Sequence, residues 1–453
     1  MGIVDSMKSL GLEKLFDYVE KDPAKNLPKI MEFADKITPG DVMGSQRAAM
    51  RRIVSDPDNN WNRMLCDLFA EIDEYVLRQA FQNFVVNGSL NGWTQQQKMR
   101  EKYGCNIPWA ILLDPTSACN LHCTGCWAAE YGNKLNLSFD EIDSIIEQGK
   151  ELGCYIYIYT GGEPLVRKKD LIAIANKHAD CEFLCFTNAT LIDDEFCREL
   201  LRVGNFIPIP SVEGFKASTD FRRGEGVYEK VTSAMKLMRE YRLAFGVSCC
   251  YTAENFDVIS SEEYIDWMVD MGVKFAWFFS YMPVGADADT SLITRPEQRE
   301  LMYERIRAYR QNKPLFTLDF MHDGEYVGGC IAGGRRYLHI NANGDMDPCV
   351  FVHYSDTNIR EHTLLEGLRR PLFRAYYDNQ PFNENMLRPC PVLDNPGRLD
   401  AIIEQTGAKS TEILQPEDVH DYSERCRDVA AGWKPRADRL WASKYHNPAL
   451  LVK

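Results

Sequence analysis

The sequence predicts an α/β protein: a partial (β/α)6 barrel, preceded by a helical region and followed by a small, loop-rich unit with a β-hairpin. Three observations lead to this prediction. Residues 1–104 carry apolar residues at three- and four-residue spacing. Across residues 105–312, short β-rich runs alternate with helical stretches. From residue 313 onward the pattern changes to a hairpin and loops. We therefore expect three units with these bounds.

The first unit is predicted to be helical because its apolar spacing is clearest over residues 10–18 and 61–84. Strand signals are few in this region. We expect either a separate helical unit or a helical layer packed on the barrel. It contains no motif with recognisable chemistry.

The second unit contains the candidate strands and helices of a barrel. The strands are predicted at residues 109–113, 155–159, 183–186, 206–210, 245–251 and 275–281, and the helices at 138–152, 193–203, 227–241, 261–271 and 296–309. Ser138 and Glu141 have the spacing of a capping box at the start of the first helix. Repeated βα units favour a parallel sheet that closes wholly or partly, with functional residues at the C-terminal ends of its strands.

The third unit is predicted to begin with a hairpin of residues 337–341 and 345–351, joined through Asn343-Gly344. This dipeptide is preferred where a tight turn needs positive φ at both central positions. The segment that follows is rich in proline and is expected to consist largely of loops.

Composition limits the classes of partner. The 453 residues include 52 basic and 66 acidic side chains, a net charge of −14. This sign disfavours a nucleic acid or an anionic membrane surface as a general partner. No run approaches the roughly 18 apolar residues of a transmembrane segment, and no signal sequence is recognisable at the N-terminus. We therefore expect a cytoplasmic protein.

A cysteine triplet follows the first predicted strand: Cys119, Cys123 and Cys126. An iron–sulfur cluster that only transfers electrons usually has a cysteine for each of its four irons. Three cysteines leave one iron open to another ligand. The alternative is a structural zinc site, which needs a second ligand pair; His122 lies within the triplet, but no such pair is nearby.

The CxxxCxxC spacing of the triplet resembles the signature of the radical S-adenosylmethionine (SAM) superfamily. The resemblance implies a [4Fe–4S] cluster on Cys119, Cys123 and Cys126, with the amino and carboxylate groups of SAM on the open iron. It implies an oxidoreductase that works under anaerobic conditions and forms a 5′-deoxyadenosyl radical by reductive cleavage of SAM. The electron donor is expected to be a protein such as flavodoxin or ferredoxin.

Further motifs resemble the same family in the same order. Gly161-Gly162-Glu163-Pro164 resembles the GGEP motif, in which the backbone and Glu163 hold the SAM ammonium group. Asn188 follows the third predicted strand, at a position whose residues line the SAM site in this family. Ser211 and Glu213 resemble the Ser-x-Asp-Gly motif of this family, in which Glu213 stands in place of Asp.

Two more positions complete the resemblance. Arg223 is expected to bind the SAM carboxylate, a task that suits a planar guanidinium. Residues 281–285 resemble the adenine-side contact. The family often has an aromatic residue just before its third cysteine, whereas this chain has Gly125, so Trp127 is expected to supply the ring.

Cys330, Cys349 and Cys390 are candidates for the ligands of one auxiliary iron–sulfur cluster, with Cys426 as a weaker fourth. This region resembles the first half of a SPASM domain or a shorter twitch domain. The third unit is therefore expected to be an iron–sulfur domain. Incidental buried thiols and a zinc site remain alternatives. With three protein ligands the open iron would be available to substrate; a fourth ligand would favour electron transfer.

The predicted function is hydrogen abstraction from a substrate that the sequence does not identify. A peptide or protein side chain is the first hypothesis, and a lipid or other small molecule is the alternative. A non-catalytic electron carrier and a zinc-binding module are the alternatives of another class. No residue is assigned to the hydrogen transfer itself. Four polar residues are candidates for substrate contact or proton acceptance, or belong to a solvated loop: Asp319, His322, Asp323 and Glu325.

Overall fold

The computed structural model describes residues 14–37 and 44–446. The predicted helix at 10–18 begins outside the described residues, and its described part is helical over 14–20.

The helical N-terminal region is confirmed. It contains α2 (Pro23–Ile37), α3 (Gly44–Ser55), α4 (Asn60–Glu71), α5 (Glu74–Ala80), the π-helix η1 (Phe81–Gly92) and α6 (Trp93–Tyr103). The stretch predicted to be helical at 61–84 is divided between α4, α5 and η1, because Ile72 is extended and Asp73 caps α5 by accepting bonds from the backbone of Tyr75 and Val76. From α5 to α6 the backbone continues as one helical rod.

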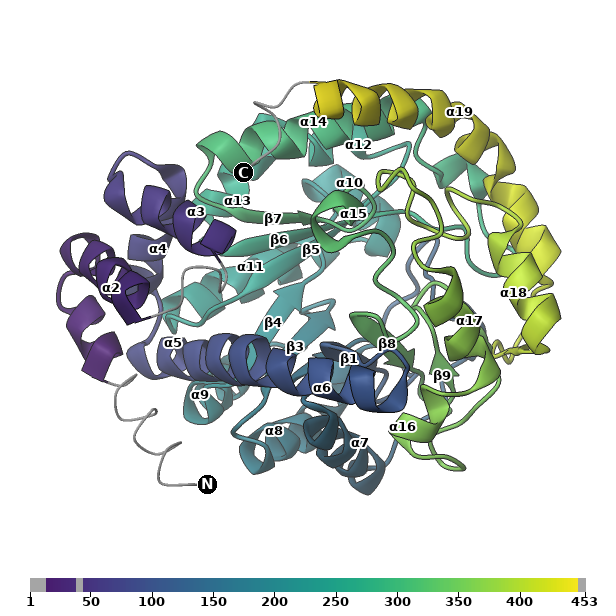
Figure 1. The fold of residues 1–453 in the computed structure, drawn as a ribbon, viewed down its shortest axis with the longest axis horizontal. Helices are drawn as coiled ribbons and strands as arrows, with labels where there is room; N and C mark the ends of the chain where they lie inside the picture. Colours follow the sequence, from purple (N-terminus) through teal and green to yellow (C-terminus); the bar gives the residue numbers. More distant parts are fainter. Residues whose placement is uncertain (1–13, 38–43, 447–453) are drawn as a thin grey trace.

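The predicted parallel strands form the inner wall of a partial barrel (Figure 1). They are β1 (Ala110–Leu113), β2 (Ile156–Tyr159), β3 (Glu182–Thr187), β4 (Phe206–Pro210), β5 (Gly246–Tyr251) and β6 (Phe275–Ser280). A seventh parallel strand, β7 (Phe316–Asp319), was not predicted. Strands β1 to β4 pair in order, as do β5 to β7. A parallel bridge between Ser211 and Ser248 joins the two sheets, so the fold class is the predicted one.

Helices cover the outside of these strands. They are α7 (Phe139–Leu152), α8 (Lys168–Lys177), α9 (Asp194–Val203), α10 (Lys216–Arg223), α11 (Val227–Glu240), α12 (Phe256–Ile259), α13 (Glu262–Asp270) and α14 (Pro296–Asn312), with 3-10 turns η2 (Ala129–Tyr131), η3 (Pro164–Arg167) and η4 (Thr290–Leu292). The capping box of Ser138 and Glu141 at α7 is confirmed.

The C-terminal region is attached to the barrel through its hairpin. Strand β8 (Tyr337–Ile340) pairs in parallel with β1 and antiparallel with β9 (Met346–Asp347). Only Gly344 has positive φ in the turn, so positive φ at both Asn343 and Gly344 is wrong. Asn341 instead closes a longer loop, with its side chain accepting bonds from the backbone of Asn343 and Asp345.

The remaining elements surround this hairpin. They are α15 (Gly324–Val327), β10 (Tyr354–Ser355), α16 (Leu364–Gly367), α17 (Pro371–Asn379), α18 (Arg398–Thr406), β11 (Lys409–Ser410) and the long α19 (Val419–His446), which runs beside α14 (Figure 1). Within the described residues, no helix combines the length and apolar composition needed to cross a membrane.

Candidate active site

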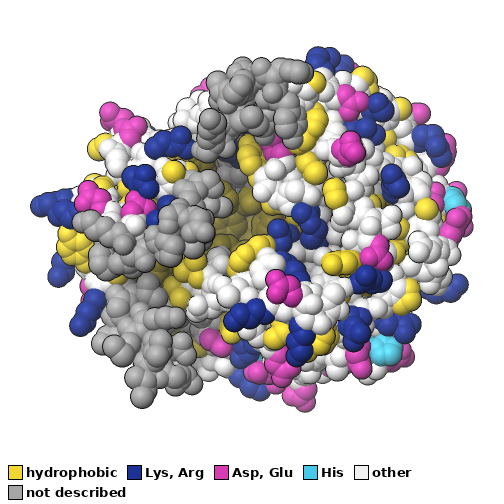
Figure 2. Space-filling model, in the orientation of Figure 1, with side chains coloured by type: hydrophobic (Ala, Val, Ile, Leu, Met, Phe, Trp, Pro, Cys, Tyr) yellow, Lys and Arg dark blue, Asp and Glu magenta, His cyan; other side chains and the backbone are white. Residues whose placement is uncertain are grey.

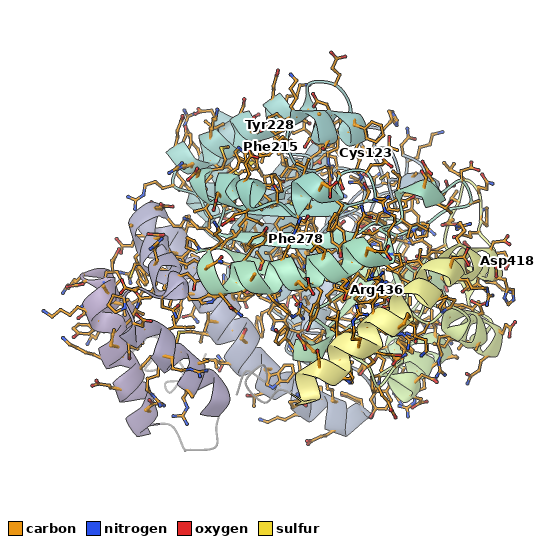
Figure 3. The ribbon with its side chains drawn as sticks, turned by 90° about the horizontal axis from the view of Figure 1, so that it is seen from above. Cys123, Phe215, Tyr228, Phe278, Asp418 and Arg436 are labelled. Atoms are coloured by element: carbon orange, nitrogen blue, oxygen red, sulfur yellow. The ribbon has the colours of Figure 1, made fainter. Side chains whose placement is uncertain are left out.

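The cysteine triplet lies at the end of the barrel that is far from the N-terminal helices, as the position of Cys123 in Figure 3 shows. Cys119, Cys123 and Cys126 line one cavity at the C-terminal ends of the strands. The loop is fixed to α10, since the backbone N–H of Thr124 donates to the Arg222 carbonyl at 2.8 Å. The position matches the functional end of a parallel barrel.

The glycines after β2 allow two backbone segments to approach closely. A Cβ at Gly162 would lie 2.3 Å from the Ala118 carbonyl oxygen, and one at Gly161, whose φ is +102°, would lie 2.8 Å from that of Thr116. The Glu163 N–H donates to the Ala118 carbonyl at 2.8 Å. Gly161 and Gly162 therefore hold the segment that leads into Cys119, and a side chain at either position would displace it.

Glu163 is a buried carboxylate that already accepts three hydrogen bonds. Its oxygens receive the N–H groups of Leu165 and Asn188, at 2.9 and 2.7 Å, and the Thr187 hydroxyl at 2.7 Å. Its bond to Leu165 caps η3, which begins at Pro164. An ionised carboxylate has about four lone-pair positions, so one acceptor position remains toward the cavity that Glu163 lines.

Asn188 connects the end of β3 to the cysteine loop. Its amide donates to the side chain of Asn120 at 2.8 Å, and Asn120 in turn donates to Thr190 at 2.8 Å. Ser211 lies nearby at the end of β4 and lines the same cavity. Both predicted residues are therefore at the cavity, and Asn188 also positions the loop between Cys119 and Cys123.

Glu213 is buried beneath two arginines. Its Oε1 receives Arg222 Nη1 at 2.6 Å and Arg223 Nε at 2.9 Å, and its Oε2 receives the Cys250 N–H at 2.8 Å. Burial alone would raise the pKa of Glu213, but the two guanidinium groups lower it below its usual value. Arg223 Nη1 remains directed toward Cys123, 4.0 Å from its sulfur.

Tyr281 fills the space beside Gly125. Gly125 has a φ of +64°, and a Cβ there would lie 2.6 Å from the Tyr281 ring. The predicted substitute, Trp127, lines the cavity but packs edge-on against His339 and His353. An aromatic ring from the end of β6 thus stands where the sequence departs from the family pattern.

The chemistry of the three thiols fits a metal cluster. Burial raises the pKa of Cys119 to about 11 and also raises that of Cys126. Because iron binds thiolates, cluster assembly here has to displace protons from these thiols. Among the residues that the structure describes, no three His, Cys, Asp or Glu side chains gather closely enough to hold one metal ion. The three thiols nevertheless share one cavity with the arginine pair, whose positive charge suits an anionic group.

A second, more apolar cavity adjoins the first. Cys330, Cys349 and Cys390 line it, whereas Cys426 is buried in α19 and does not. The Tyr337 hydroxyl lies 2.7 Å from the Cys349 sulfur, and Tyr337 lines both cavities. The three predicted cysteines therefore line one cavity, and Cys426 is not among its lining residues.

The acidic and histidine candidates after β7 are held in ion pairs. Asp319 and His322 are fully buried and lie 2.7 Å apart, while Asp323 pairs with Arg310 at 2.6 Å. Glu325 pairs with Arg307 of α14. These residues fix the segment after β7 to the helix outside it, rather than forming a solvated loop.

Comparison with known proteins identifies the family. The profile of the radical SAM superfamily matches residues 113–259, which include the cysteine triplet and the segments around Glu163 and Glu213. Residues 113–259 therefore form a radical SAM domain. An AdoMet-dependent heme synthase of Methanosarcina barkeri is 23% identical over 290 residues, which cover 58% of this chain and 82% of that protein.

Two further relatives extend the comparison of this radical SAM enzyme. An uncharacterized protein of Archaeoglobus fulgidus is 30% identical over 275 residues, 56% of this chain and 64% of that protein. The structure of Streptococcus suis SuiB bound to precursor peptide SuiA has a TM-score of 0.57 and 18% identity, and covers 73% of this chain and 80% of that one. The latter likeness shows the shared fold.

Several residues that line or support this cavity were not predicted from the sequence. Arg222 shares Glu213 with Arg223, and Cys250 lines the cavity. On β6, Phe275, Trp277 and Phe279 alternate with fully buried residues, and the last two line the cavity. Their alternation was a signal in the sequence, since successive strand residues point to opposite faces.

Proposed function

We propose that this enzyme binds a [4Fe–4S] cluster through Cys119, Cys123 and Cys126 and cleaves SAM reductively to abstract hydrogen from a substrate. The observation that carries the proposal is one cavity lined by these thiols together with Glu163, Asn188 and the arginine pair. When bound, the cluster and SAM would supply the electron and the 5′-deoxyadenosyl radical that takes the hydrogen atom.

The chain's own residues bind and orient these groups. The free acceptor position of Glu163 suits the SAM ammonium group, and the Nη1 of Arg223 suits its carboxylate. Glu213 fixes the arginine, and Tyr281 supplies a ring at the adenine side. The aromatic and aliphatic side chains that line the cavity disfavour water beside the radical, which limits its side reactions.

We also propose that Cys330, Cys349 and Cys390 hold one auxiliary cluster in a SPASM- or twitch-like domain. Support comes from their common cavity, which shares Tyr337 and other walls with the active site. Burial raises the pKa of Cys330 to about 11 and that of Cys349 to about 12, so cluster binding displaces protons here as well. Because Cys426 does not line this cavity, we propose three cysteine ligands for the auxiliary cluster.

A peptide substrate remains a candidate because SuiB, which has the same fold, was crystallised with precursor peptide SuiA. The apolar side chains that line the cavity support the second candidate, a lipid or other hydrophobic small molecule. In both cases the electron donor is proposed to be a flavodoxin- or ferredoxin-type protein.

Anaerobic reconstitution tests the proposal. With dithionite and SAM, the full chain is expected to form 5′-deoxyadenosine, and Cys119→Ala should abolish this product. Cys105→Ala is the matched control, because Cys105 is buried in the core away from both cavities. Unchanged product formation in Cys119→Ala would contradict the proposal.

Iron content tests the auxiliary cluster separately. The triple variant Cys119→Ala/Cys123→Ala/Cys126→Ala should retain iron and sulfide, and adding Cys349→Ala should remove them. A triple variant without iron would refute the auxiliary cluster and leave the radical SAM proposal unaffected.

A further inference from the structure

The inner face of β6 continues the active-site cavity as an aromatic wall. Phe275, Trp277 and Phe279 lie on this face and are half-buried, whereas Ala276 and Phe278 are fully buried on the opposite face. Trp277 and Phe279 line the same cavity as the cysteine triplet, together with Trp109, Ala110, Leu112, Ile158, Phe186 and Phe320. Hydrocarbon side chains and aromatic rings therefore form a large part of the wall of this cavity.

The charged side chains of this cavity lie at its two ends. Glu163, Arg222 and Arg223 are at the cysteine loop, after the end of β1. Arg336 also lines the cavity. It lies at the other end, next to the start of β1, since its carbonyl accepts hydrogen bonds from the N–H groups of Trp109 and Ala110. The four residues of β1 span about 13 Å, so an apolar section of roughly this length separates the two charged ends.

Arg336 belongs to a group of three cations without an anionic partner. In the part of the chain that the structure describes, the guanidinium groups of Arg100, Arg335 and Arg336 donate to backbone carbonyls and none forms an ion pair with a carboxylate. The Trp93 ring lies between two of them, 5.1 Å from Arg100 and 4.6 Å from Arg336. Half-buried cations of this kind are costly unless an anion joins them.

Burial and mutual repulsion both make these arginines less basic than usual. Burial and the neighbouring arginines lower the pKa of Arg100 to about 10, and the same two causes lower that of Arg336. An anion at this position would remove the repulsion. A carboxylate or phosphate suits it best, because both match the planar fork of a guanidinium.

An apolar approach leads to this end of the cavity. On η1, Phe84, Val85 and Leu90 are exposed, and Phe84 packs edge-on against Trp109 with ring centroids 5.3 Å apart. Figure 2 shows a hollow with a hydrophobic floor in the middle of this face, with basic side chains beside it. The hollow and the lining residues give a long apolar molecule a route into the barrel.

We propose that the cavity binds an anionic amphiphile, with its hydrocarbon chain along Trp277 and Phe279 and its carboxylate or phosphate head group at Arg336. The proposal rests on the hydrogen abstraction proposed above and names the molecule that supplies the C–H bond. The aromatic wall places a methylene group near the cysteine loop, while the head group is held at the far end of β1. The distance between Arg336 and the cysteine loop then determines which carbon of the hydrocarbon chain reacts.

The proposal is tested by the binding of three probes that have alkyl chains of the same length: palmitate, hexadecyl phosphate and hexadecanol. The probes are titrated into the full, reconstituted chain below their aggregation concentrations, with displacement of a fluorescent fatty acid as the readout. Both anionic probes should bind at least tenfold more tightly than hexadecanol, since a charge-assisted bond is worth at least one such factor. The stronger of the two anions identifies a fatty acid or a phospholipid as the source.

Two variants separate the head group from the chain. Arg336→Gln should weaken palmitate and hexadecyl phosphate about tenfold and leave hexadecanol unchanged, whereas Trp277→Gln should weaken all three. Lys98→Gln, which removes an exposed cation from α6, is the matched control and should change nothing. Equal binding of charged and neutral probes, or no effect of Arg336→Gln, would overturn the proposal.

Analysis of the reaction products distinguishes a failure of the amphiphile proposal from a failure of the proposed radical SAM function. With chain-deuterated palmitate or hexadecyl phosphate, deuterium should appear in 5′-deoxyadenosine. If SAM is cleaved but no alkyl probe binds, and a peptide donates the hydrogen instead, the amphiphile is excluded and the radical SAM function stands. If no 5′-deoxyadenosine forms at all, the proposed function itself fails.

Discussion

At the scale of single residues, the active site depends on one buried carboxylate. Glu213 is completely buried and compensates the charges of Arg222 and Arg223. The Arg222 carbonyl accepts a bond from the Thr124 N–H of the cysteine loop, and Arg223 faces Cys123. The family pattern has the shorter Asp here. The extra methylene of Glu213 lets one oxygen receive two guanidinium groups while the other receives the Cys250 N–H.

We expect Glu213→Gln to destabilise the fold by about 3–5 kcal/mol, because it leaves two buried guanidinium groups without an anion. The free energy of unfolding is measured on the apoprotein with urea and tryptophan fluorescence. Glu229→Gln breaks the exposed ion pair with Lys216 and should have little effect. Equal stability of the two variants would show that another group compensates the positive charge of the buried arginines.

A second residue-scale prediction concerns pH. His339 is fully buried between Asp114 and Asp347, with ring nitrogens 3.0 and 3.3 Å from their oxygens. Burial alone would lower the pKa of His339, but the two carboxylates raise it to about 10. An unfolded histidine has a pKa near 6.5, so its charge stabilises the fold fully below about pH 6.5, and this stabilisation is lost as pH rises toward 10.

Wild type should therefore lose more unfolding free energy between pH 7 and pH 10 than His339→Gln does. Urea unfolding at several pH values gives the difference, and His362→Gln, which lies outside this network, should follow the wild type. Parallel pH profiles of wild type and His339→Gln would mean that the imidazole is neutral in the folded protein.

At the scale of elements, the rod from α5 to α6 packs against the segments that lead into β2 and β3 at the N-terminal end of the barrel. Gln96 donates to the Gly153 carbonyl at 2.8 Å, and Asn83 donates to the carbonyls of Ala179 and Cys181 at 3.0 Å. A Cβ at Gly92 would lie 2.4 Å from the Gly153 carbonyl oxygen. Close packing of the rod against the chain before β2 therefore depends on this glycine.

Gly92→Ala should destabilise the protein by about 1–3 kcal/mol, because the added methyl group overpacks the contact. In an open helix the same change would stabilise by up to about 1 kcal/mol, so the sign of the effect decides between the two situations. Thermal unfolding measures it, with Ser89→Ala on the exposed face of η1 as the control. A stabilised Gly92→Ala would mean that the rod packs more loosely than the structure shows.

The sequence was sufficient to predict these elements where the pattern is local. All six predicted strands of the barrel exist, since each is a short β-rich run bounded by turn residues. The break between α4 and α5 was not predicted, because apolar spacing continues through Ile72 and only the Asp73 cap interrupts the helix. Pairing of β8 with β1 could not be predicted, since it joins segments far apart in the chain.

In the active site, too, local sequence patterns could be predicted and long-range contacts could not. The cysteine triplet and Glu163 follow from motifs of fixed spacing, and the structure places them on one cavity. The role of Tyr281 beside Gly125 and the position of Arg336 at the far end of the lumen depend on strand packing. Motif spacing reports which groups meet the cofactor, whereas the shape of the substrate space comes from tertiary contacts.

At the scale of the whole molecule, the sheet crosses the predicted boundary at residues 312 and 313. Strand β7 pairs with β6, and β8 pairs with β1 along its full length. On the other side of the molecule, α19 packs on α14, where Arg436 pairs with Glu297 and Glu300 (Figure 3). Both free edges of the radical SAM sheet are thus completed by the C-terminal region.

We therefore expect a chain of residues 1–312 to be aggregated or partly unfolded. Without β7 and β8, the backbone N–H groups of Asp114 and Trp109 lose their partners, and the edges of β1 and β6 are exposed to other chains. Size-exclusion chromatography and circular dichroism measure the outcome. Co-expression of residues 313–453 as a second polypeptide should restore a soluble complex, because these contacts are non-covalent. A monomeric, cooperatively unfolding 1–312 fragment would show instead that the barrel folds as an independent domain.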